Sequence, residues 1–119
     1  MTKASYSQDA LVHDALIAGD FPIRTAKVTI ASGQAALKRG TLLGKITASG
    51  KCIVSLSAAA DGSQVPYAVL AEDTAAAAAD ITALVYLSGD MKSSEMTFGA
   101  GHSAASTKDA LRNLSIYLA

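Results

Sequence analysis

The side chains that could carry catalysis are few, and their spacing forms no catalytic set. His13 and His102 are the only histidines, and His102 adjoins Ser103 in a stretch rich in glycine and alanine, which predicts an exposed, mobile loop. A serine nucleophile needs a base that a third group orients, and adjacent residues rarely direct both side chains to one point. A hydrolase using Asp61 and His102 is therefore the least favoured hypothesis. The sequence predicts no enzyme and no catalytic residue.

Metal and cofactor chemistry is equally poorly supported. Cys52 is the single cysteine, and neither histidine is followed four residues later by a metal-type ligand, the spacing of helical metal sites. The glycines at Gly40 and Gly44 precede Lys45 but lack the GxxxxGK[ST] spacing of a phosphate loop. Asp61 precedes Gly-Ser, where an aspartate typically bonds its own turn. We expect no metal, no cofactor and no small-molecule substrate, and Cys52 is predicted to be a core residue.

The charge pattern argues against nucleic acid and membrane partners. Ten basic and ten acidic residues cancel and are scattered along the 119 residues, so no basic stripe can neutralise phosphates. No segment approaches the roughly 20 apolar residues of a spanning helix. Lys3 is followed by polar residues, unlike a signal peptide. The protein is therefore expected to be made in the cytoplasm.

Hydrophobic alternation predicts a fold rich in β-strands. Gly44 lies within one such segment, where it predicts a bulge or a close approach, and Gly89-Asp90 is expected to end another. Ser106 and Asp109 resemble a capping box that opens a helix over residues 106–114. The strands are expected at 28–30, 41–47, 52–57, 65–71, 81–87, 96–98 and 115–118. These elements predict a mainly β (α+β) fold, a small β-sandwich or barrel-like body with one short C-terminal helix.

An N-terminal arm precedes this body. Residues 1–8 are small and polar, whereas residues 9–18 place apolar side chains on one helical face. A ten-residue helix is too short to be stable alone in water. It either packs on the domain or orders against a partner. We therefore divide the chain into an arm at 1–20, flexible or ordered by a partner, and a β-rich body at 21–119.

The hydrophobic percentage overstates the number of large side chains that can form a core. Half of the chain is hydrophobic, but 25 of those 60 residues are alanine and only two are phenylalanine. Large apolar side chains supply most of the free energy of burial. The core is therefore expected to be thin, which favours an oligomer or a large partner.

Three segments of the body, in order and spacing, resemble a known family. They are KRGTLLGKIT at 38–47, DGSQVPYAVLAED at 61–73 and ALVYLSGD at 83–90, with AGDFP upstream at 18–22. Together they resemble the head decoration (capsid-stabilising) proteins of lambda-like tailed bacteriophages across roughly residues 18–118. The C-terminal helix followed by a short strand is also similar to that family.

This resemblance implies a structural role. Such proteins form homotrimers at three-fold positions on the outside of the expanded phage head, bind the major capsid protein and stabilise the shell against DNA pressure. Their arm becomes ordered on the capsid, often by strand addition, although the helical spacing of residues 9–18 leaves a docked helix possible. The apolar residues outside the regular strands that are predicted to contact the capsid or a neighbouring subunit are Leu11, Val12, Leu16, Ile17 and Phe21.

A different binding module is the alternative. A small β-barrel could serve as an adaptor or carrier domain of another assembly. A carrier needs a modifiable lysine or serine at an exposed hairpin tip, and Lys51, near Ser49 and Gly50, is the one candidate. Lys51 lacks the flanking methionine or serine expected there, so the decoration-protein hypothesis is preferred.

Overall fold

The computed structural model describes residues 16–19, 21–75 and 77–119. Within them, strands dominate and one α-helix lies near the C-terminus, which confirms the predicted mainly β fold. The elements are β2 (Arg24–Ile30), β3 (Leu42–Lys45), β4 (Cys52–Val54), β5 (Pro66–Leu70), β6 (Ile81–Met91), the 3-10 turn η1 (Ser93–Glu95), α2 (Ala104–Asn113) and β7 (Ile116–Leu118).

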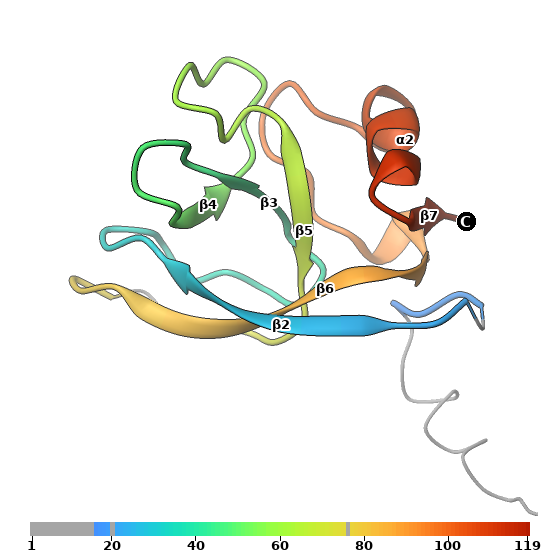
Figure 1. The fold of residues 1–119 in the computed structure, drawn as a ribbon, viewed down its shortest axis with the longest axis horizontal. Coiled ribbons are helices and arrows are strands. Elements are labelled where there is room, and N and C mark those ends of the chain that lie inside the picture. The colour runs from blue at the N-terminus through green and yellow to red at the C-terminus, as the bar shows by residue number, and fades with distance from the viewer. Residues whose placement is uncertain (1–15, 20, 76) are drawn as a thin grey trace, which may run out of the picture.

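Five strands close into a small barrel. The order is β2-β4-β3-β5-β6, and β6 pairs antiparallel with β2 to complete the ring. Strand β7 lies outside the ring, parallel to the C-terminal end of β6. In Figure 1 the long β2–β6 ribbon crosses the base of the molecule, and α2 and β7 lie together at one end of it.

The barrel core and a second core lie on opposite faces of β3 and β5. Leu43 and Leu70 point into the barrel, whereas Leu42 and Val69 point toward the side that carries α2. This split follows from the two-residue period of a strand. The barrel core contains Ile30, Leu37, Leu43, Cys52, Ala68, Leu70, Ala83 and Val85. The second core contains Leu16, Leu42, Val69, Met91, Met96, Leu111 and Ile116.

Gly44 has the role that the sequence predicts. The register between β3 and β5 shifts between Leu43 and Gly44, which is the predicted bulge. A Cβ atom at Gly44 would lie 1.8 Å from the carbonyl oxygen of Ser63. Gly44 therefore allows the turn around Ser63 to lie directly against β3.

Strand β6 is longer than predicted. It continues through Gly89 and Asp90 to Met91, so the prediction that these two residues end the strand was wrong. Gly89 adopts a φ of 140°, which glycine tolerates. Strand β7 pairs with residues 89–91, and Ile17 bridges to Met91. This pairing keeps the ladder intact beyond the glycine.

The helix begins earlier than predicted, and its cap is a different serine. Ser103 is the N-cap: its Oγ accepts the Ser106 N–H at 3.1 Å, and the Ser106 Oγ accepts the Ser103 N–H at 2.9 Å. Ser106 is thus the third helical residue of the capping box and not its first member. Arg112 lies in the last turn as expected.

Several shorter elements also differ from prediction. Strands β3 and β4 end earlier than the predicted 41–47 and 52–57, and the predicted strand at 96–98 is one isolated bridge, Thr41 to Thr97. The predicted helix at 9–18 lies mostly outside the described residues. Its last three residues, 16–18, are not helical, because they pair with the end of β6.

Candidate functional site

An exposed aromatic pair lies where the N-terminal segment crosses the end of β6. The rings of Phe21 and Tyr117 meet edge to face, with centroids 4.9 Å apart and planes at 71°. Each residue is 36% exposed. Asp90 lies opposite Tyr117 in the β6–β7 register, and its Oδ2 accepts the Phe21 N–H at 3.3 Å. We call Phe21, Tyr117 and Asp90 the aromatic face.

The Ser88 side chain holds the backbone next to Phe21 in place. The Ser88 Oγ donates to the Pro22 carbonyl at 2.9 Å and accepts the Arg24 N–H at 3.0 Å. Gly19 lies against the Asp90 side chain, and a Cβ atom there would displace the Asp90 carboxylate. Asp90 therefore contacts this segment at both Gly19 and Phe21.

The predicted contact residues have different positions. Leu11 and Val12 lie outside the described residues. Leu16 is 3% exposed and belongs to the second core. Ile17 is half-buried in its bridge to Met91, and Phe21 is exposed on the aromatic face. Within this subunit, Leu16 therefore contributes to packing, and Phe21 offers the accessible surface.

Tyr117 is a surface residue that the sequence reasoning missed. In the strand at 115–118, Ile116 and Leu118 share one face, and the same alternation directs Tyr117 to the other. Its proximity to Phe21 could not be foreseen, because 95 residues of chain separate the two rings, which meet where β7 and Phe21 both contact the end of β6.

His102 is part-buried and hydrogen-bonded, contrary to the predicted exposed, mobile loop. Its Nε2 lies 3.0 Å from the Gln64 carbonyl and 3.1 Å from the Ser55 Oγ. A carbonyl oxygen only accepts, so Nε2 must carry a hydrogen. The Ser55 hydroxyl donates to the Ser63 carbonyl at 2.7 Å. His102 cannot take the proton of Ser55 through Nε2, and the contacts instead join three loops.

Comparison with family models identifies the chain. The model described as bacteriophage lambda head decoration protein D matches residues 4–117, nearly the whole sequence. The chain belongs to this family. No individual curated protein gives a significant match. The family is structural, and its members are located on the phage capsid, which favours the decoration-protein hypothesis over an adaptor module.

A second exposed region of this decoration protein lies around Lys45. A shallow groove of about 380 Å³ is lined by Lys45, Thr47, Gly62, Val65, Pro66 and Tyr67. The Lys45 ammonium lies 5.2 Å from the centre of the Tyr67 ring, and Val65 is 58% exposed. None of the residues that line this groove belongs to the aromatic face.

The remaining candidate residues of the decoration protein have structural roles. Asp61 bonds its own turn as predicted: its Oδ1 accepts from the Ser63 hydroxyl and backbone N–H, and these bonds lower the pKa of the Asp61 carboxyl. Cys52 is buried in the barrel core, as predicted, and burial raises the pKa of its thiol. Lys51, the carrier candidate, forms an ion pair with Asp80.

The described residues contain no group of three or more His, Cys, Asp or Glu side chains that could hold a metal ion. In the same part of the chain, no helix has the length and hydropathy needed to cross a membrane.

Proposed function

We propose that this chain is a cement protein that binds as a homotrimer to the outside of the mature phage head at three-fold positions. There it holds neighbouring major capsid proteins together against the pressure of the packaged DNA, and it acts as a structural component without enzymatic activity. It is made in the host cytoplasm and joins the outer surface of the virion. The observation that carries this proposal is the family match across residues 4–117.

The aromatic face supports a role in contact with the capsid. The Ala18 N–H donates to the Asp90 carbonyl at 2.9 Å, and the Lys92 N–H donates to the Leu16 carbonyl. These bonds fix the point at which residues 1–15 join the body, directly beside Phe21. The predicted arm residues Leu11 and Val12 therefore precede an apolar surface that is already in place. Arm and face together could form one continuous contact.

The composition suits this kind of binding. The formal net charge is zero, so the chain as a whole has no net attraction to a charged surface, and exposed apolar surface supports binding instead. Exposed aromatic rings are the side chains that most often dominate protein interfaces. Three copies in one trimer would make the contact trivalent, which raises avidity without any new contact.

The proposal is tested with the full chain and expanded heads of the phage that encodes it. Analytical ultracentrifugation should give the mass of a trimer at micromolar concentration, or on the heads a stoichiometry of three chains per three-fold position. Decorated heads should release DNA at a higher temperature than bare heads. A chain that neither binds heads nor changes their DNA retention would refute the cement function.

Single substitutions locate the contact. Phe21→Ala should weaken head binding by at least tenfold, since truncation of an aromatic hot spot costs about 2 kcal/mol or more. Val65→Ala is the matched control, because Val65 is exposed and apolar but lies in the Lys45 groove. A deletion of residues 2–15 tests the arm while retaining Leu16 in the core. Equal affinity of the Phe21 and Val65 variants would exclude the aromatic face as the contact.

A further inference from the structure

The barrel has one weak seam, between β2 and β4. These strands pair through a single residue pair, Ile30 with Cys52, and one further bond joins the Ala31 N–H to the Cys52 carbonyl at 3.0 Å. On its other side β2 pairs with β6 over its whole length, from Arg24 to Ile30. Backbone hydrogen bonds therefore contribute least to closure of the ring at this seam.

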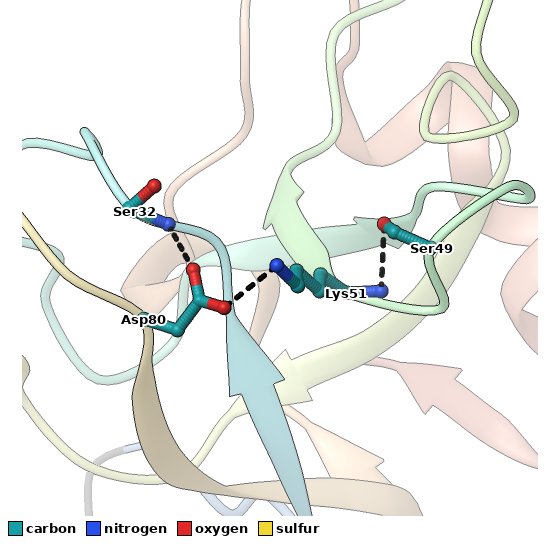
Figure 2. A network of polar contacts seen from close by, with 4 residues as sticks. All are labelled: Ser32, Ser49, Lys51 and Asp80. Atoms are coloured by element: carbon teal, nitrogen blue, oxygen red, sulfur yellow. Dashed lines mark hydrogen bonds and ion pairs between the residues drawn. The ribbon is translucent and has the colours of Figure 1, made fainter.

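A polar clamp bridges the same place. The Lys51 ammonium lies 2.7 Å from the Asp80 Oδ2, and the Asp80 Oδ1 accepts the Ser32 N–H at 2.8 Å. Figure 2 shows the Asp80 carboxylate between the two partners, while the Lys51 backbone N–H bonds the Ser49 hydroxyl. Lys51 immediately precedes β4, Ser32 follows β2, and Asp80 precedes β6. One carboxylate thus ties the ends of β2 and β4 to each other and to the start of β6.

We propose that this clamp is a latch, and that the barrel opens locally at the β2–β4 seam when the latch is released. In the open form β4 leaves β2 but stays paired with β3 through Leu43, Gly44 and Lys45. The second core, α2 and β7 contain no residue of the seam and remain folded. The inference concerns the free subunit and does not depend on the proposed capsid function.

Cys52 reports this opening directly. It is the only cysteine of the chain, its side chain is fully buried in the barrel core, and it is the β4 residue of the single pair. A buried thiol reacts only from a form that exposes it. Local openings usually require less free energy than global unfolding. The alkylation rate of Cys52 therefore measures how often the seam opens.

The latch lies at the surface, so its effect on the rate should be moderate. The Lys51 and Asp80 side chains are 40% and 35% exposed. Half-exposed ion pairs of this kind shift an equilibrium by up to about fivefold. We expect Asp80→Asn to speed alkylation about three- to fivefold, since asparagine keeps an acceptor for the Ser32 N–H. Asp80→Ala loses that acceptor as well and should have a larger effect.

The experiment alkylates the native full-length chain with iodoacetamide, a neutral reagent, and follows the mass of the product. Denaturant unfolding of each variant gives its free energy of global unfolding. Together with the alkylation rate of the unfolded chain, this free energy sets the labelling rate that global unfolding alone would allow. Wild-type Cys52 should react faster than that limit. Lys51→Met should match Asp80→Asn, although the two substitutions change the charge near the thiol in opposite directions. A shift in thiolate population cannot explain an increase in both.

Asp109→Asn is the control, because it removes the same type of charge from a more exposed pair with Arg112 on α2. It should leave the alkylation rate unchanged. Raising NaCl to 0.5 M should speed the wild-type reaction and leave Asp80→Asn unaffected, since salt screens the ion pair. The latch is refuted if wild-type labelling is no faster than global unfolding permits. It is also refuted if Asp80→Asn behaves like Asp109→Asn.

Discussion

Replacement of Gly44 in β3 by alanine should destabilise the barrel more than replacement of a glycine that lies in an open turn. The new Cβ would lie 1.8 Å from the Ser63 carbonyl oxygen and 2.6 Å from its carbon. Even a contact of 3.0 Å requires a backbone shift of about 1.2 Å, the difference between 3.0 and 1.8 Å. Ser63 is fully buried, and its carbonyl accepts the Ser55 hydroxyl, so the turn cannot move away freely.

The cost can be worked from these contacts. Overpacking against backbone costs about 3 kcal/mol, and loss of the Ser55 bond adds about 1 kcal/mol. The lower entropy of the unfolded alanine chain returns up to about 1 kcal/mol. The net destabilisation is about 3 kcal/mol. With about 2.1 cal/mol/K of unfolding entropy per residue, the 119-residue chain should lose about 12 °C in Tm.

Gly33→Ala provides the comparison. Gly33 has a φ of +83° but no atom within 4 Å of the added Cβ, so only backbone strain opposes the change. That strain costs about 1–2 kcal/mol, and the same entropy gain reduces it. Thermal and urea unfolding are measured for both variants. Gly33→Ala should lower Tm by about 4 °C. If Gly44→Ala lowers Tm no more than Gly33→Ala does, β3 and the Ser63 turn do not approach each other as closely as the structure shows.

Three further predictions test the helix, the second core and the Asp61 turn. Ser103→Ala should cost about 1 kcal/mol in urea unfolding through loss of the N-cap, and an unchanged midpoint would argue against the cap. Leu111→Ala should cost about 2–5 kcal/mol because Leu111 is fully buried; a smaller loss would mean that the second core collapses around the cavity. Because the folded pKa of Asp61 is lowered by bonds from Ser63, its stabilising effect is complete above its ordinary pKa near 3.8 and is lost as pH falls through the lower folded value. Asp61→Asn should therefore flatten the decline of stability below about pH 4, and an unchanged acid limb would contradict this.

Local patterns predicted most of the strands but not how they close. The predicted strands at 65–71 and 81–87 and the bulge at Gly44 all depend on patterns among neighbouring residues. Pairing of β2 with β6 joins segments more than 50 residues apart, and no local signal specifies it. The end of β6 was misjudged for the same reason. Glycine and aspartate usually mark a turn, but β7 and residues 16–18 pair beside them and continue the strand.

The surface that we propose contacts the capsid could be predicted from the sequence only in part. Phe21 and Leu16 are both apolar residues outside the predicted strands, but Phe21 is exposed whereas Leu16 lies in the second core. Leu16 packs in the same cluster as Met91 and Leu111, which are distant in sequence. His102 was misplaced in the same way. Its partners Ser55 and Gln64 lie 47 and 38 residues away, so the glycines around it gave a misleading impression of mobility.

The small side chains have a structural reason beyond a thin core. Ala68 and Ala83 are fully buried inside the barrel, where they pack beside larger side chains such as Leu43 and Leu70. The second core beneath α2 contains Met91, Leu111 and Ile116. Strand β6 joins the two regions, because it begins at Ile81 beside the seam and ends at Met91 beneath β7. The aromatic face therefore lies at the β7 end of β6, and the weakly paired seam lies at the other end. This separation lets the barrel open near Cys52 without disturbing the surface that we propose contacts the capsid.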